Sequence, residues 1–121
     1  ADMVSMGTRF IATQESDASE NYKKMLTQVS ASDIVYTPKL SGVNANFIMP
    51  SLRENGIDLA ALGDHGPASM EEELGPNSKA WRDIWSAGQG VGAVRDVPTV
   101  AELVARLRSE YTSAASRLKP L

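Results

Sequence analysis

A glycine–threonine pair near the start of the chain is the first candidate for chemistry. Gly7 and Thr8 interrupt the apolar run VSMGTRFIAT, residues 4–13. Glycine lets another group approach the backbone closely, and the threonine beside it offers a main-chain N–H and a hydroxyl. Such a pair suits an anion, because (β/α)8 barrels often hold a phosphate with main-chain donors in the loops after strands 7 and 8. If only this pair of residues is considered, a tightly packed bulge in a strand is a more favoured interpretation than an anion site.

A second glycine-rich stretch lies at residues 86–92, SAGQGVG. Three glycines in five residues indicate that the backbone here passes close to another group. Gln89, in the middle of the stretch, is a candidate hydrogen-bond donor to a bound phosphate or cofactor. An ordinary helix-breaking loop is an equal alternative.

Two further polar segments are predicted to be exposed to solvent and to take no part in catalysis or metal binding. His65 is the single histidine of the chain and lies in the sequence GDHG, residues 63–66, which is typical of a surface loop. Glu71, Glu72 and Glu73 are consecutive, so their carboxylates point in different directions and favour a hydrated surface over a metal site. We therefore predict no catalytic residue and no metal ligand within the chain.

Composition excludes several classes of protein. The 121 residues fit one globular domain, and 42% of them are hydrophobic. The net charge of −3 gives no basic field for nucleic acid, and the absence of cysteine excludes disulfides, iron–sulfur ligation and a cysteine nucleophile. The apolar runs are too short to span a membrane, and the first residues lack the pattern of a signal peptide. We expect a cytoplasmic protein.

The first predicted element is a strand. Met3–Thr13 is apolar with little alternation, as in a strand that is covered on both faces within a parallel sheet. Arg9, inside this run, is expected either to pair with Glu15 or to approach a bound anion.

Two helices are predicted from their caps and apolar spacing. Asp17 and Glu20 have the spacing of a capping box, and apolar residues follow at helical intervals, which predicts a helix over about 18–29. Thr99 and Glu102 form a second capping box and predict a helix from there to about residue 118, with its apolar residues on one face.

The segments between these helices are predicted as short elements and loops. Residues 33–37 are expected to form an isolated extended segment that ends at Pro38. Residues 50–54 read as one or two helical turns with a left-handed cap at 55–56. Residues 63–78 read as a surface loop with one helical turn near 70–74. Trp81 and Trp85, four residues apart, are expected to pack as core aromatics.

Together these motifs resemble the C-terminal part of the nitronate monooxygenase family, formerly called 2-nitropropane dioxygenases. The resemblance rests on MGTRF at 6–10, on the following Ala12, Thr13 and Glu15, on IWSAGQGV at 84–91, and on the closing helix. It extends from Asp2 to about Leu118, and residues 57–78 match least. The flavin-dependent enoyl-acyl-carrier-protein reductases look similar.

The resemblance implies an α/β fold, a TIM (β/α)8 barrel that binds FMN non-covalently. It assigns the FMN phosphate to the main chain of Gly7 and Thr8, with Met6 beside them and Gln89 as a further cofactor-binding residue. In this interpretation residues 1–15 are the last barrel strand and phosphate loop. Residues 16–97 are a helical and loop extension, and 98–119 are the C-terminal helix.

A barrel needs about 200 to 250 residues, so we expect the chain to be the C-terminal third of a longer protein and its partner to be the N-terminal part of the barrel. That part is expected to hold the catalytic base. The expected activity is FMN-dependent oxidation of alkyl nitronates or of a related small substrate. An enoyl-thioester or quinone reductase, or a non-catalytic module that docks through its C-terminal helix, is an alternative, and a homodimer stays open. Residues 41–47, SGVNANF, lack the arginine that many family members carry, which leaves the substrate undetermined.

Overall fold

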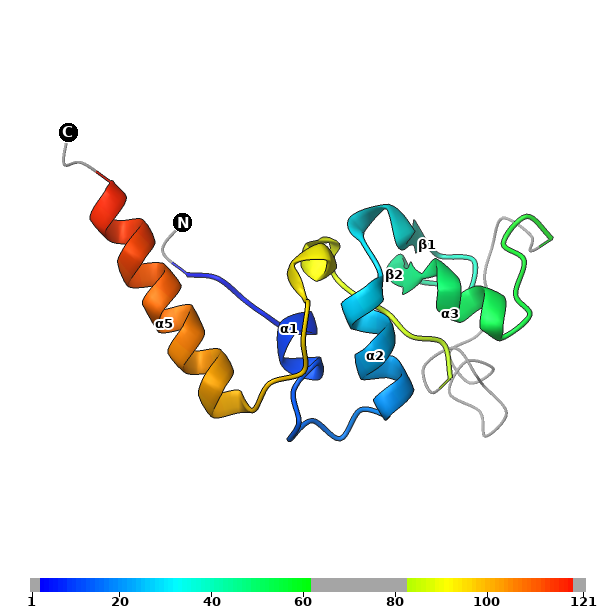
Figure 1. Cartoon of the computed structure of the whole chain (residues 1–121). Helices are drawn as coiled ribbons and strands as arrows, with labels where there is room; N and C mark the ends of the chain where they lie inside the picture. Colours follow the sequence, from blue (N-terminus) through cyan, green and yellow to red (C-terminus); the bar gives the residue numbers. More distant parts are fainter. Residues whose placement is uncertain (1–2, 62–82, 119–121) are drawn as a thin grey trace.

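The computed structural model describes residues 3–61 and 83–118 of the chain (Figure 1). These residues form short helices around a small antiparallel sheet, and a longer helix stands to one side. In chain order the elements are α1 (Thr8–Ile11), α2 (Glu20–Gln28), η1 (Ala31–Asp33), β1 (Ile34–Thr37), β2 (Ala45–Ile48), α3 (Met49–Glu54), η2 (Gln89–Ala93) and α5 (Val100–Arg117). None of the helices in these two ranges has the length and apolar content that a membrane crossing requires.

Helix α1 replaces the second half of the predicted first strand. The carbonyl of Gly7 accepts hydrogen bonds from the N–H groups of Phe10 at 2.9 Å and Ile11 at 3.2 Å, which closes one helical turn. Residues 3–7 lead into this turn without forming a strand, and Met3 is 90% exposed. The prediction of a strand over Met3–Thr13 is therefore wrong, because residues 3–7 form no strand and Thr8–Ile11 is helical. Apolar spacing in so short a run did not distinguish a strand from a helical turn.

Helix α2 forms where the sequence predicted a helix but begins two residues later than the predicted cap. The hydroxyl of Ser19, and not Asp17, accepts the hydrogen bond from the N–H of Tyr22. Its apolar side turns Met25 and Leu26 into the core. Either residue type can cap a helix, so local sequence alone did not decide between them.

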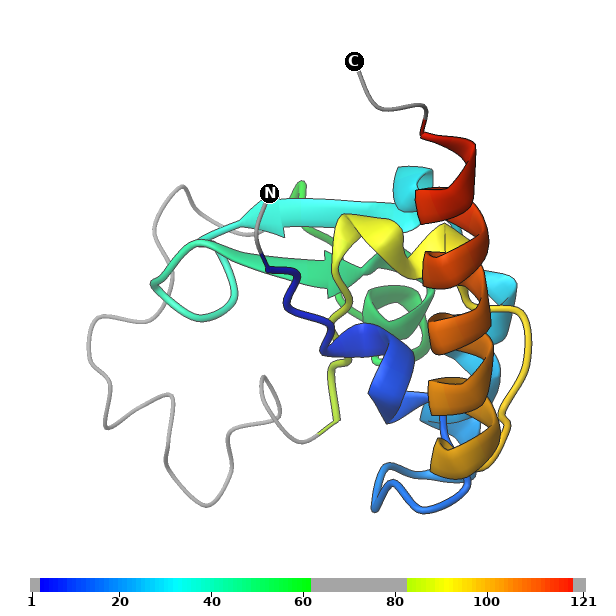
Figure 2. The same cartoon turned by 90° about the vertical axis from the view of Figure 1, so that its left-hand side faces the viewer.

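The segment predicted to be isolated is one strand of a hairpin. β1 pairs with β2 in antiparallel register, with Ile34 opposite Ile48 and Thr37 opposite Ala45, and the strands lie side by side in Figure 2. Gly42, with a φ of 70°, makes the turn and donates to the carbonyl of Pro38 at 2.8 Å. The sequence analysis missed β2 because alanine and asparagine are poor strand formers.

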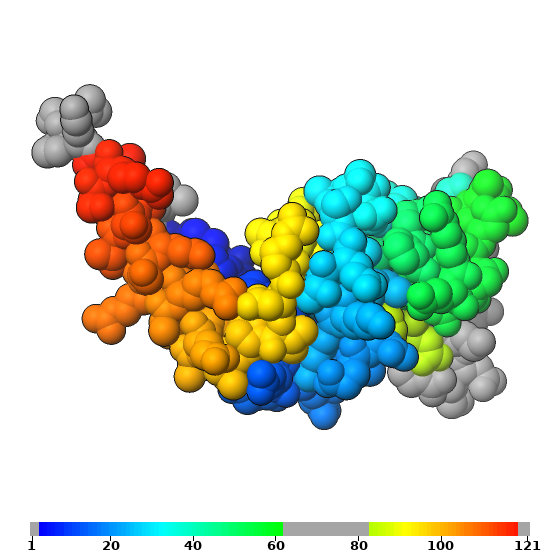
Figure 3. All heavy atoms as spheres, in the orientation of Figure 1, coloured from blue at the N-terminus to red at the C-terminus, as the bar shows by residue number. Residues whose placement is uncertain are grey.

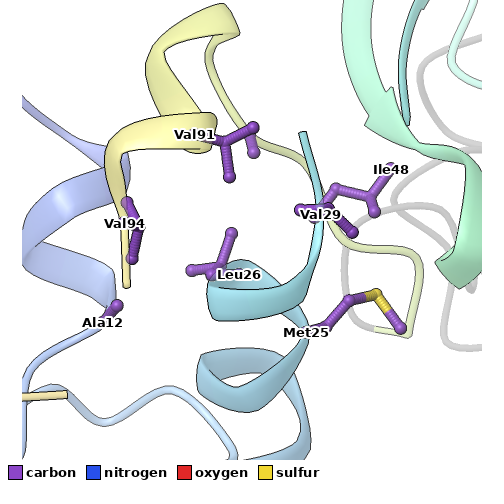
Figure 4. Close-up of a cluster of buried hydrophobic side chains, with 8 residues drawn as sticks. Ala12, Met25, Leu26, Val29, Ile48, Val91 and Val94 are labelled. Carbon is purple, nitrogen blue, oxygen red and sulfur yellow. The ribbon is translucent and has the colours of Figure 1, made fainter. Parts of the chain in front are cut away.

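The described core consists of two neighbouring clusters. Figure 4 shows the larger one, in which side chains of α2 face Val91 and Val94 on one side and Ile48 on the other. The smaller one joins Phe47, Leu52 and Ile84 beneath the hairpin. Because the N–H of Ile48 donates to the carbonyl of Trp85 at 2.9 Å, the hairpin also fixes the segment that leads to η2.

The predicted short helix and the predicted C-terminal helix are both confirmed. α3 ends before Gly56, which has the expected left-handed φ of 70°. In α5, Thr99 and Glu102 form the predicted capping box. Figures 1 and 3 show the second half of α5 projecting away from the other described elements, and Tyr111 there is 77% exposed.

Candidate functional site

The two glycine-containing stretches meet in the structure, although 80 residues separate them in sequence. The N–H of Gly88 donates to the hydroxyl oxygen of Thr8 at 2.9 Å. A threonine hydroxyl that accepts this bond keeps its own O–H available as a donor. The contact, here called the Thr8–Gly88 bridge, therefore places one O–H donor and several glycine main-chain groups in one place.

The start of α1 offers further main-chain donors at the same point. The first N–H groups of a helical turn have no intrahelical partner, and in α1 these belong to Thr8 and Arg9. Gly7 is the N-cap residue of α1 and contributes no side-chain cap. A Cβ built on Gly7 would meet no heavy atom of residues 3–61 and 83–118 within 4 Å. The backbone at Gly7 thus has open space beside it that a small anion such as a phosphate group fits.

Two cavities adjoin the Thr8–Gly88 bridge, and Gly7, Thr8 and Gly88 line both of them. The first, of about 440 Å³, lies toward α5 and is called the α5-side cavity. Its lining includes Met6 and three charged residues: Arg9, Arg106 and Glu110. The second, of about 330 Å³, lies toward β2 and is called the β2-side cavity. Its described lining carries no charged side chain; it includes Asn46 and Ser86.

A shared carboxylate fixes the two arginines of the α5-side cavity. Asp96 accepts from Arg9 at 2.9 Å and from both terminal nitrogens of Arg106 at 3.0 and 2.7 Å, and its main-chain carbonyl accepts from Arg9 at 3.0 Å. The hydrogen bonds from Arg106, with a smaller contribution from Arg9, hold the pKa of Asp96 below its usual value. Arg9 therefore pairs with Asp96, and the expected pairing with Glu15 is wrong.

Glu15 instead holds the start of α5. Both of its carboxylate oxygens accept from the N–H of Val100 at 2.9 Å, and the N–H of Gln14 donates to the carbonyl of Pro98 at 3.0 Å. A carboxylate at a helix N-terminus also interacts favourably with the helix dipole. These contacts place the first turns of α5 beside α1 and so form one wall of the α5-side cavity.

A stacked aromatic pair positions the segment that leads to Gly88. The rings of Tyr22 and Trp85 lie 5.0 Å apart at an angle of 12°, and the Tyr22 hydroxyl donates to the carbonyl of Ser86. Burial raises the pKa of Tyr22. Trp85 thus packs against the core as expected, whereas Trp81 lies outside the described residues. Helix α2 therefore anchors the backbone two residues before the Thr8–Gly88 bridge.

Comparison with known proteins identifies the family. A family model described as nitronate monooxygenase matches residues 1–110. The chain belongs to the nitronate monooxygenase family. No curated protein matches the chain.

Solved structures show the same fold in part. The chain is similar to a point mutant of FabK from Thermotoga maritima, with a TM-score of 0.63 and 23% sequence identity. The match covers 93% of this chain and 34% of the FabK mutant. It is also similar to FabK itself, with a TM-score of 0.63 and 22% identity over 93% of this chain and 37% of that one. The chain thus spans about a third of the length of these structures. Its mixed helix and strand content fits part of an α/β barrel.

The residues that the family resemblance singled out fall into two groups. Met6, Gly7 and Thr8 lie together on the α5-side cavity. Gln89 is exposed in η2 and lines neither cavity, whereas its neighbours Gly88 and Gly90 line the α5-side cavity. His65 and Glu71–Glu73 lie outside the described residues. Within 3–61 and 83–118, no three acidic or histidine side chains gather closely enough to hold a metal ion.

Sequence reasoning missed Asn46, Arg106 and Glu110, which line these cavities. It also missed Asp96, which accepts hydrogen bonds from Arg9 and Arg106. Asp96 and Arg9 are 87 residues apart, so no local pattern connects them. Asn46 lies in a strand that was not predicted. Only the ten-residue spacing between Asp96 and Arg106, across the start of a predicted helix, offered a weak signal of their pairing.

Proposed function

We propose that this chain is the C-terminal, phosphate-binding part of an FMN-dependent oxidoreductase. One observation carries the proposal. The backbone at Gly7 faces open space at the start of α1, beside the Thr8–Gly88 bridge, in a chain of the nitronate monooxygenase family. The rest of the barrel, with the catalytic base, is proposed to belong to the remainder of the protein.

In this proposal the N–H groups of Gly7 and Thr8 donate to the phosphate oxygens of FMN. The Thr8 hydroxyl, which already accepts from Gly88, donates its own hydrogen to the same group. Barrels often hold a phosphate in the loops after strands 7 and 8 and at the N-terminus of a short extra helix, and we propose that α1 takes this place in the whole barrel. When bound, the flavin supplies the redox chemistry, and these residues bind and orient it. Arg9 and Arg106 lie on one side of the site, where Asp96 and Glu110 balance their positive charges, so the proposed phosphate contacts come from the main chain and from Thr8.

The comparisons favour two of the expected substrate classes for the whole protein. The family match supports oxidation of an alkyl nitronate. The similarity to FabK favours a second candidate, reduction of an enoyl thioester, on the same scaffold. The two differ in the direction of electron flow, because a nitronate reduces the flavin, whereas an enoyl thioester accepts electrons from it.

The cofactor is tested with variants of Thr8 in the intact protein that contains this chain. Thr8→Val removes the hydroxyl at nearly constant volume, and Thr8→Ser, the matched control, keeps it. A hydrogen bond to a charged group contributes about 1.5–3 kcal/mol, so we expect Thr8→Val to weaken FMN binding roughly tenfold to a hundredfold. Thr8→Ser should stay within a few-fold of the parent protein. An intact protein that stays colourless after addition of FMN contradicts the proposal.

The substrate class is tested with the flavin-loaded intact protein under anaerobic conditions. Bleaching of the flavin by ethyl nitronate supports the first candidate. Bleaching by a reduced nicotinamide, followed by return of colour with crotonyl thioester, supports the second. A flavin that responds to neither reagent contradicts both.

A further inference from the structure

The β2-side cavity contains a polar side chain with no partner in the described part of the chain. Asn46 lines this cavity together with Gly7 and Thr8. Its carboxamide makes no hydrogen bond within residues 3–61 and 83–118. A partly buried amide that forgoes its hydrogen bonds costs free energy, so a ligand that satisfies it gains from the contact.

Core packing does not explain the asparagine. Successive residues of a strand point to opposite faces, and Phe47, the next residue, is completely buried. Asn46 lies on the other face, opposite Tyr36, which is 65% exposed. Asparagine is also disfavoured in strands. Neither core packing nor strand propensity therefore accounts for an asparagine at this position of β2.

The two cavities differ in charge. The α5-side cavity presents Arg9, Arg106 and Glu110, and the described lining of the β2-side cavity has no charged residue. The uncharged lining of the β2-side cavity matches an uncharged polar group, and a carboxamide can both donate to such a group and accept from it. Both cavities reach the Thr8–Gly88 bridge, where the phosphate is proposed to bind.

We infer that the β2-side cavity receives the uncharged part of bound FMN, with the Asn46 carboxamide hydrogen-bonded to it. This inference rests on the proposed function and adds a cofactor-binding residue from the hairpin. The hairpin then acts as a wall of the flavin site, and the cofactor extends from the Thr8–Gly88 bridge toward β2.

Riboflavin separates this contact from phosphate binding, because it lacks the phosphate and keeps every uncharged group of FMN. The flavin-free intact protein is titrated with FMN and with riboflavin, and quenching of flavin fluorescence gives both Kd values. Asn46→Ala should weaken both ligands by the same factor, roughly three- to tenfold for one neutral hydrogen bond. Asn44→Ala changes an exposed asparagine two residues away and should leave both values unchanged.

Two other results of the titration overturn the inference. Weaker FMN binding with unchanged riboflavin binding places the phosphate, and not the uncharged part, at Asn46. Unchanged binding of both ligands removes the residue from the site. A loss of thermal stability in Asn46→Ala is resolved with Asn46→Ser, which keeps a hydrogen-bonding group and should bind more tightly than Asn46→Ala. If the parent protein binds neither FMN nor riboflavin, the proposed function fails, and this inference fails with it. That result differs from weaker binding in the Asn46 variant alone, which concerns only this inference.

Discussion

Removal of the Tyr22 hydroxyl tests how the glycine-rich segment is held in place. Tyr22 donates to the carbonyl of Ser86, and its ring stacks on Trp85 at 5.0 Å. Tyr22→Phe keeps the stack and leaves the Ser86 carbonyl without this donor. We expect the free energy of unfolding to fall by about 1 kcal/mol, since neutral hydrogen bonds contribute about 0.5–1.5 kcal/mol. Tyr22→Leu also removes the stack and should cost at least about 1 kcal/mol more.

The same residue predicts a pH dependence. Burial raises the pKa of Tyr22 above its usual value of 10.0, so the native state keeps the phenolic proton to higher pH than the unfolded chain. Its contribution to stability is therefore complete below about pH 10 and declines as the pH rises further. Tyr22→Phe should remove this part of the alkaline loss of stability.

Urea unfolding of the intact protein, followed by circular dichroism at neutral and alkaline pH, measures both effects. Tyr36→Phe is the matched control, because Tyr36 is 65% exposed and its hydroxyl has no hydrogen bond within the described residues. Tyr36→Phe should have the stability of the parent protein. The reasoning is refuted if Tyr22→Phe is as stable as the parent, or if Tyr36→Phe loses as much as Tyr22→Phe.

Two further substitutions test the contacts that join α5 to α1. The pKa of Asp96 is lowered in the native state, so its contribution to the free energy of unfolding is present above the usual aspartate pKa and is lost as the pH falls through the lowered pKa. Asp96→Asn should remove this loss of stability at acid pH. Thermal unfolding measured over a range of pH tests this. Glu15→Gln weakens the charged cap of α5 and should cost about 1 kcal/mol in urea unfolding. Asp17→Asn changes a nearby exposed carboxylate and should cost nothing measurable, so equal losses in both variants contradict the capping role.

The sequence predicted the elements that local chemistry determines. The helix after Thr99 follows from a capping box and a regular apolar spacing, and the structure has both. The end of α3 follows from Gly56, because glycine readily adopts the left-handed conformation found there. In each case the decisive interactions lie within a few residues of chain.

Elements that depend on distant partners were predicted poorly. β2 contains Ala45 and Asn46, and its strand conformation comes from pairing with β1, not from propensity. The first turn of α1 was read as a strand because apolar residues in a short run fit both structures. Arg9 was expected either to pair with Glu15, six residues away, or to approach an anion, whereas its partner is Asp96 near the other end of the chain. Similarly, the glycine–threonine pair pointed to an anion, but Gly88 as its neighbour emerged only from the fold.

The most direct test of the central claim compares FMN and riboflavin in a Gly7→Ala variant of the intact protein. Gly7 has a φ of −95°, which alanine adopts readily, and the added methyl meets no atom of the described residues within 4 Å, so it enters open space beside the proposed phosphate site. Gly92→Ala, whose methyl also makes at most ordinary contacts, is the control. We predict that Gly7→Ala weakens FMN binding about tenfold or more and leaves riboflavin binding unchanged. Equal affinity of Gly7→Ala and Gly92→Ala for FMN would contradict a phosphate site at Gly7 and Thr8.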